Sequence, residues 1–355
     1  MGMRRDGKSQ RYDALDALRG VAAVGVLATH SLQLLLADGV LNHTPFRMLA
    51  NGRSFVIFFF VLSGFVLATS LWNAPQRSSY LTYVLSRTAR LYPPYLFAGI
   101  AGFLIAALSG HVGLDALLQY AAVTGTESGR ALNNPSWSLV YELRLSFLMP
   151  MICLVIVRNL KVAIALAVVL FVAEEIALIV TGIGQYAYGG ETVLEALITT
   201  AHFAISFIVG ALLAYDWKNE KLVFVTVSHH PFVAAGVAFI TMSLLLDQLS
   251  MVGSIMLIAL ALTWAPFKIL LAHPVLQWLG RVSYSLYLTH LLLLTLFGVL
   301  LKDAVPAYVP VVFGVPMCFA VAEIFYNSVE KPCIALSRKV RSTTGKARSQ
   351  LAAAR

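Results

Sequence analysis

The sequence predicts an all-α, polytopic integral membrane protein with about ten transmembrane helices. Charged residues make up 12% of the 355 residues, about half the share that is usual in soluble domains. Hydrophobic residues reach 59%, the mean hydropathy is +0.79, and the apolar residues fall in long runs. So few charges do not cover the surface of a water-soluble globule, so soluble classes are excluded.

The apolar runs have the length of membrane-spanning helices, which need about 20 mostly apolar residues. Short polar stretches separate them, and no internal repeat is visible. The ten predicted spans are Leu18–Ala37, Ser54–Trp72, Pro94–Ser109, Trp137–Val157, Val162–Thr181, Thr192–Tyr215, Pro231–Leu246, Ser250–Ala265, Val282–Leu301 and Tyr308–Tyr326.

The distribution of Lys and Arg predicts the orientation in the membrane, because short cytoplasmic loops carry an excess of both. If the N-terminus is inside, most of the 26 Lys and Arg residues lie on the cytoplasmic side. Only Arg47, Arg53, Arg130 and Lys302 then lie outside. We therefore expect both termini in the cytoplasm. The formal charge of +9 is dispersed between apolar runs, which excludes the single basic patch of a nucleic-acid-binding protein.

We expect one transmembrane domain over residues 1–332. Residues 333–355 are polar and basic, which predicts a poorly ordered cytoplasmic tail attracted to anionic lipid. The three cysteines, Cys153, Cys318 and Cys333, lie in or beside spans without metal-ligand spacing. They are interpreted as small buried residues, and neither a metal site nor a disulfide framework is predicted.

Ionisable side chains inside a bilayer are costly, so each is a candidate functional residue. Arg19 and His30 are about three helical turns apart, on nearly one face, with a rise of about 16 Å. A cation at the membrane edge and an imidazole at depth suit a ligand that is anionic at one end and reactive at the other. The alternative, which spacing alone does not exclude, is that Arg19 anchors the helix and His30 packs against a serine or a carbonyl.

Two further arginines follow the second span. Arg87 and Arg90 are three residues apart and share a helix face, immediately before a Pro-Pro pair that we expect to stop the helix. Arginine is the preferred bidentate partner of phosphate, so both join Arg19 as candidates for a basic mouth. The alternative is that they serve only to orient the chain.

The fourth span begins with Trp137 and Ser138 and carries Glu142 and Arg144. Trp137 suits the membrane interface. Glu142 is a candidate to orient a histidine or to meet a hydroxyl acceptor, and the alternative is an ion pair with Arg144.

In the ninth span Ser283, Tyr287 and His290 form one polar stripe, which must face protein or a water-filled cavity. His202 has no motif around it and is interpreted as structural. Glu174 and Glu175 have no partner in the local sequence.

Several blocks resemble one family. Leu15-Asp16-Ala-Leu-Arg19-Gly20 followed by His30 matches an Arg-x10-His signature, and Ser63-Gly64-Phe65 closes an aromatic block in the second span. Arg87-x-x-Arg90-Leu-x-Pro93, Trp137-Ser138-Leu139-x-x-Glu142, the segment from Gly280 to His290 and Glu330-Lys-Pro332 follow in order. Together they resemble the membrane acyltransferase family 3 of bacterial O-acyltransferases. The segment Leu-Arg144-Leu-Ser146 departs from the aromatic residues that many members carry there, which leaves the acceptor open.

The resemblance implies an acyltransferase of the bacterial cytoplasmic (inner) membrane. It would move an acyl group, most often acetyl, from cytoplasmic acetyl-CoA or another acyl-CoA to a hydroxyl of a carbohydrate or glycoside acceptor, as in polysaccharide O-acetylation. Arg19, Arg87 and Arg90 would contact the CoA phosphates, and His30 would be the base, aided by Glu142. Ser63, Trp137, Ser138, Tyr287 and His290 are candidates to line the substrate site.

The sequence leaves three questions open. It does not identify the acyl group, and it does not distinguish direct transfer from transfer through an acyl-enzyme. It also does not show whether the protein forms a homo-oligomer. The alternative function is a secondary transporter that exports a glycan intermediate or a small acid, since midplane charges also mark transporters. Transporters commonly show inverted repeats and Gly/Pro-broken helices in matching halves, and the sequence predicts neither.

Overall fold

The computed structural model describes residues 12–35, 52–74, 79–108, 112–182, 192–219, 221–244, 246–301 and 308–353, with residues 44, 49, 110, 305 and 306 between them. Arg47 and Lys302 lie outside the described residues. Within the described residues the chain forms helices joined by turns and contains no strand. The helices are α1 (Asp13–Leu35), α2 (Arg53–Trp72), α3 (Tyr80–Leu108), α4 (Leu114–Ala121), α5 (Glu127–Arg130), η3 (Asn134–Ser136), α6 (Trp137–Arg158), α7 (Leu160–Thr181), α8 (Val193–Lys218), α9 (Leu222–His229), α10 (Pro231–Ser243), α11 (Asp247–Thr263), α12 (Ala265–Leu271), α13 (Pro274–Leu300), α14 (Tyr308–Phe325), η4 (Tyr326–Glu330) and α15 (Lys331–Ala353).

Eight helical segments of the described chain are long and apolar enough to cross a membrane, and the number rises to ten if two bent pairs count as one span each. This range confirms an all-helical, multi-pass membrane protein. The bent pairs are α9 with α10, at 105°, and α11 with α12, at 91°. Pro231 and Pro266 stand at the starts of α10 and α12. Proline lacks a backbone N–H and its ring clashes with the preceding helical turn, which explains two breaks that the span lengths alone did not predict.

The expected helix stop at the Pro-Pro pair is wrong. Helix α3 runs from Tyr80 to Leu108 and contains both Pro93 and Pro94. Membrane helices tolerate internal proline where neighbouring groups satisfy the freed carbonyls. Arg87 and Arg90 therefore belong to a continuous helix, one turn apart on its first half.

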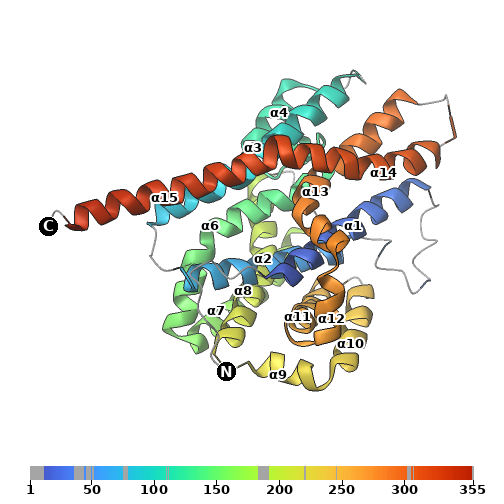
Figure 1. Cartoon of the computed structure of the whole chain (residues 1–355). Coiled ribbons are helices and arrows are strands. Elements are labelled where there is room, and N and C mark those ends of the chain that lie inside the picture. The colour runs from blue at the N-terminus through green and yellow to red at the C-terminus, as the bar shows by residue number, and fades with distance from the viewer. Residues whose placement is uncertain are drawn as a thin grey trace.

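The expectation of poor order after residue 332 is also wrong for the first part of that segment. Helix α15 packs along α3, and the buried Ser337 donates a hydrogen bond of 2.6 Å to the carbonyl of Ser86. Figure 1 shows α15 continuing past the bundle toward the C-terminus. A polar segment gains order here because its first turns have a partner helix that sequence alone does not reveal.

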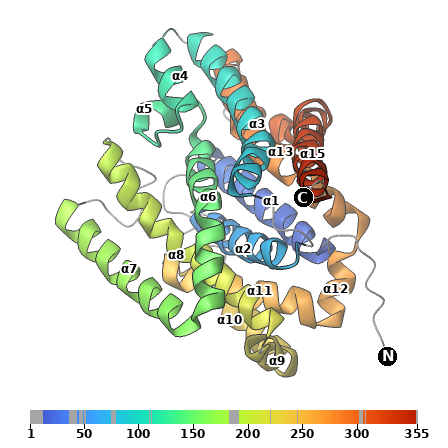
Figure 2. The same ribbon diagram turned by 90° about the vertical axis from the view of Figure 1, so that its left-hand side faces the viewer.

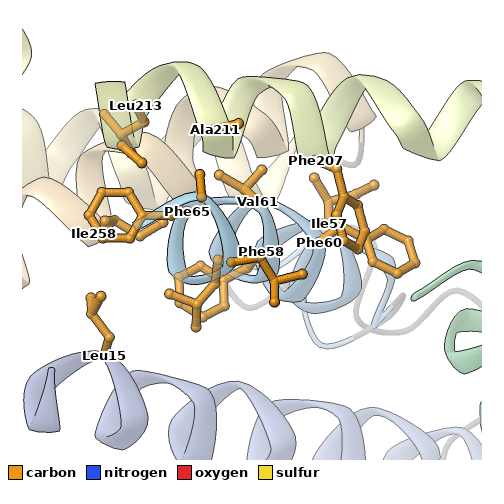
Figure 3. Close-up of a cluster of buried hydrophobic side chains, with 14 of the residues drawn as sticks. Leu15, Ile57, Phe58, Phe60, Val61, Phe65, Phe207, Ala211, Leu213 and Ile258 are labelled. Atoms are coloured by element: carbon orange, nitrogen blue, oxygen red, sulfur yellow. The ribbon is translucent and has the colours of Figure 1, made fainter. Parts of the chain in front are cut away.

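Helices α1 and α2 lie centrally in the bundle, with α7 and α8 on one side and α15 on the other (Figure 2). The side chains of α2 fill the space between α1 and α8, as Phe58, Val61 and Phe65 do in Figure 3. Close packing with α8 requires glycine, because a Cβ on Gly64 would meet the backbone of Phe207. Small residues permit such backbone contact between membrane helices, so the Ser-Gly-Phe block has a packing role.

Candidate active site

Helices α1 and α13 run parallel and pair with one constant offset in sequence. Near their first turns Gly20 meets Gly280, where a Cβ on Gly20 would lie 2.5 Å from the backbone nitrogen of Gly280. Ten residues further along each helix, His30 Nδ1 lies 2.8 Å from His290 Nε2. Because the spacing is the same on both helices, the glycine contact sets the register that brings the two imidazoles together. The histidine contact lies about 15 Å along the helices from the glycine contact.

The hydrogen bonds of His290 determine which nitrogen of His30 carries a proton. His290 Nδ1 lies 2.9 Å from the carbonyl oxygen of Leu286, and a carbonyl only accepts, so this nitrogen is the donor. In neutral His290 the other nitrogen, Nε2, is then an acceptor, and His30 donates to it from Nδ1. Neutral His30 consequently keeps an unprotonated Nε2, which is the atom a general base needs.

Glu142 of α6 is hydrogen-bonded to a residue of α2. Ser63 of α2 donates a hydrogen bond of 3.3 Å to Glu142 Oε1. One turn earlier on α6, Ser138 Oγ is 2.7 Å from the hydroxyl of Tyr287, whose ring centroid lies 6.1 Å from that of His290. Hydrogen bonds therefore join candidates on α2 and α6 and on α6 and α13, and Tyr287 brings the second pair beside His290.

A pocket borders Glu142 between α3, α6 and α13. It is lined mainly by aromatic and apolar side chains, and Glu142 is the ionisable carboxylate at its wall. An adjoining, more open pocket shares Tyr92, Val123 and Leu143 with it and extends to Thr88, Arg144 and Phe147. The residues that line the first pocket are Leu91, Tyr92, Tyr95, Val123, Leu139, Glu142, Leu143 and Tyr284.

The three candidate arginines lie close enough together for their charges to interact. The charges of Arg87, Arg19, Glu330 and Glu142 all act on Arg90, which keeps an exposed surface. Arg19 forms an ion pair of 2.8 Å with Asp16. Within the described residues, the buried Nε of Arg87 has no hydrogen-bond partner. An unsatisfied buried donor is costly, so this cluster is suited to an anion.

Arg144 does not pair with Glu142. Its terminal nitrogens donate to the carbonyls of Val123 and Thr124, at 2.8 and 2.7 Å, and to the hydroxyl of Thr200 at 3.0 Å. The turn it holds has a left-handed residue, Val123, with φ of 55°. The departure from the family pattern at Arg144 thus supports the turn that lines both pockets.

A second polar cluster connects four helices away from these pockets. Arg53 of α2 binds both oxygens of Asp247, with Nε–Oδ1 at 2.8 Å and a terminal nitrogen 2.7 Å from Oδ2. His202 reaches Asp247 at 2.8 Å through Nε2 and Glu174 at 3.1 Å through Nδ1. Sequence reasoning gave Glu174 no partner, because its partner is on another helix. Glu175 accepts a bond of 2.8 Å from Gln248.

Two sequence interpretations need correction or extension. Trp137 is not at an exposed membrane interface, since it is buried against Phe60 and Phe203. Glu330 was noted only as part of a motif, yet it is buried, accepts a bond of 2.6 Å from Ser285, and is a counter-charge to Arg90 and Arg19. Within the described residues no group of three or more His, Cys, Asp or Glu side chains is arranged to hold a metal ion.

This fold and this site define a multi-pass membrane protein with a pair of hydrogen-bonded histidines, a pocket bordered by a carboxylate and a cluster of arginines. The family model of acyltransferase family 3, an acyltransferase domain, matches residues 12–326. The chain belongs to this family, and it is a membrane acyltransferase. Comparisons with curated proteins and with solved structures give no match.

Proposed function

We propose that this acyltransferase moves an acyl group, most often acetyl, from acyl-CoA on the cytoplasmic side of a bacterial inner membrane to a hydroxyl of a sugar or glycoside. The observation that carries the proposal is the His30–His290 pair, with its unprotonated nitrogen on His30. The acceptor class and the acetyl group rest on the family resemblance. Parallel α1 and α13 agree with the proposed orientation, because each would enter the membrane from the cytoplasmic side.

The arginine cluster supports an acyl-CoA donor. Coenzyme A carries a diphosphate and a third phosphate at one end and the thioester at the other. Arg19 and Arg90 suit the diphosphate because guanidinium groups bind phosphate with paired N–H donors. The rise of about 16 Å from Arg19 to His30 suits an extended pantetheine arm between phosphate and thioester.

The proposed reaction is direct attack of the acceptor on the thioester. His30 Nε2 takes the proton of the acceptor hydroxyl while the acceptor oxygen bonds to the thioester carbonyl carbon. The carbon–sulfur bond then breaks, and the CoA thiolate takes the proton from His30. Throughout these steps Nδ1 of His30 donates to His290, which therefore orients the base.

Glu142 has a different part in this proposal. Because His290 occupies the orienting position next to His30, Glu142 is the group that binds the acceptor hydroxyl in the pocket it lines. Ser63, Ser138 and Tyr287 are the nearby hydroxyl groups able to support the tetrahedral oxyanion.

The test is release of CoA by purified protein supplied with acetyl-CoA and a panel of hydroxyl acceptors. We expect His30→Ala to lower kcat by about 10²- to 10⁴-fold, the contribution typical of a general base. Arg19→Ala should raise KM for the donor. His229→Ala, at an exposed position of α9, is the matched histidine control and should be unchanged. No turnover of any acyl-CoA by wild type would contradict the proposal, and full activity of His30→Ala would remove the base.

A further inference from the structure

The C-terminal helix α15 contributes a fourth arginine to the basic cluster. Arg341 Nε donates a hydrogen bond of 3.0 Å to the hydroxyl of Ser86, the neighbour of Arg87 on α3. The charge of Arg87 acts on Arg341. Sequence reasoning assigned Arg341 to a polar tail, so this proximity comes from the packing of α15 on α3.

Three of these guanidinium groups, on α3 and α15, follow one another away from the pocket. The charge of Glu142, at the pocket wall, acts on Arg90. Arg87 lies one helical turn before Arg90 on α3, and Arg341 lies beside Arg87. The arginine on α15 is therefore the outermost of these three.

Nearby acidic groups do not balance this series. Three carboxylates lie near the four arginines: Asp16 pairs with Arg19, and Glu330 and Glu142 act on Arg90. Among the described residues no ion pair joins Arg87 or Arg341 to a carboxylate. Arg87 is only 6% exposed and its Nε has no partner there. Like charges repel, so a bound anion would stabilise Arg87 and Arg341.

We infer that Arg341 and Arg87 together bind the terminal phosphate of the donor, the 3′-phosphate of an acyl-CoA, while Arg19 and Arg90 hold the diphosphate. The inference rests on the proposed acyl-CoA donor. A guanidinium group has five N–H donors, and the described contact with Ser86 uses one of those on Arg341. The remaining donors match a phosphate that enters between α3 and α15.

A purely structural role for Arg341 is the competing explanation, because its contact with Ser86 also fastens α15 to α3. The two roles differ in what a substitution changes. Loss of the contact between α15 and α3 would change KM equally for every donor. Loss of a phosphate contact would change KM only for a donor that carries that phosphate. The 3′-dephospho form of acetyl-CoA therefore separates them.

The experiment measures KM and kcat for acetyl-CoA and for 3′-dephospho-acetyl-CoA with wild type, Arg341→Ala and Arg341→Lys. We expect wild type to prefer acetyl-CoA by about tenfold or more in KM, as for one charge-assisted contact. Arg341→Ala should raise KM for acetyl-CoA about tenfold. Its KM for the dephospho donor and its kcat should stay within about twofold of the wild-type values, so the variant should lose the preference for acetyl-CoA. Arg341→Lys should retain part of it.

Two controls complete the design. Arg338→Ala removes an exposed arginine of the same helix, and Ser337→Ala removes the other contact of α15 with Ser86. Both should keep the wild-type preference. The inference is overturned if wild type does not distinguish the two donors, or if Arg341→Ala changes KM equally for both or lowers kcat alone. If wild type turns over neither donor, the proposed function itself fails.

Discussion

Two histidines at the centres of two polar clusters have opposite surroundings. His202 places both ring nitrogens against carboxylates. Ionised carboxylates only accept, so both nitrogens donate and the ring is an imidazolium. His30 faces a second imidazole whose other nitrogen donates to a carbonyl, so its ring keeps a lone pair. The partners, more than the depth in the membrane, decide whether a histidine is suited to act as a base.

The same contrast holds for the charges of the two regions. In the His202 cluster Arg53 and the imidazolium balance Asp247 and Glu174, and all four side chains are buried. In the candidate active site arginines outnumber the carboxylates near them. A closed, neutral network stabilises the fold, whereas a site with unbalanced charge and a free lone pair is prepared for a ligand.

The largest expected effect comes from opening the closed network. Asp247→Asn removes the carboxylate that serves both Arg53 and His202, and it leaves buried cations without their counter-charge. We expect a loss of about 3–5 kcal/mol in the free energy of unfolding, measured by thermal or denaturant unfolding in detergent. Asp115→Asn, at an exposed position of α4, is the control and should change stability by less than about 0.5 kcal/mol. Equal effects of the two substitutions would refute the closed network.

The role of the histidine pair is tested by substituting His290, which accepts the hydrogen bond from His30. His290→Ala leaves the Nδ1–H of His30 without its acceptor, so the orientation of the base is lost. We expect kcat to fall by about 10- to 100-fold, equivalent to about 1–3 kcal/mol, with little change in KM. His290→Gln offers a carbonyl oxygen in place of Nε2 and should recover part of the rate. If the glutamine and alanine variants have the same kcat, His290 does not act through this hydrogen bond.

A smaller effect is expected from the turn that lines both pockets. Arg144→Lys keeps the charge but loses the planar group that reaches Val123 and Thr124 together. We expect KM for the acceptor to rise about fivefold, equivalent to about 1 kcal/mol, while KM for the donor stays constant. Arg158→Lys, at the exposed end of the same helix, should leave both constants unchanged. A parallel rise in both KM values would indicate general loosening of the fold.

The smallest effect comes from the residue next to Asp247 in sequence. Gln248 donates one bond to Glu175, outside the ionic network. Gln248→Ala should cost about 0.6 kcal/mol of unfolding free energy, the average for a hydrogen bond between membrane helices. The same unfolding assay compares it with Asp247→Asn. A cost as large as that of Asp247→Asn would mean that the two polar contacts form one unit.

Much of the fold and of the site was predictable from local patterns. Long apolar runs locate the spans, and the run that carries Arg19 and His30 is one helix, as its pattern predicts. The polar stripe of Ser283, Tyr287 and His290 is buried, as a stripe within the bilayer requires. These features depend on residues close together in sequence.

The remaining features depend on contacts between distant segments. Arg53 and Asp247 are 194 residues apart, so the local sequence around either residue does not predict their ion pair. His30 and His290 were both candidates, but their contact depends on the register of two helices. The order of α15 and the place of Arg341 likewise require knowledge of α3. The bends at Pro231 and Pro266 do have a local signal, the prolines themselves. The apolar runs around them were interpreted as spans from their length alone.

The parallel pairing of α1 and α13 ties the lengths of two segments that are far apart in the gene. One inserted residue between Gly20 and His30 would turn His30 by about 100° and advance it by about 1.5 Å, so the glycine contact and the histidine contact would no longer exist together. An insertion in the other segment would not restore them, because it turns His290 away as well. The length of each stretch is therefore fixed by the other. Single side chains can be substituted in these stretches, but an insertion is compatible with both contacts only in the loops.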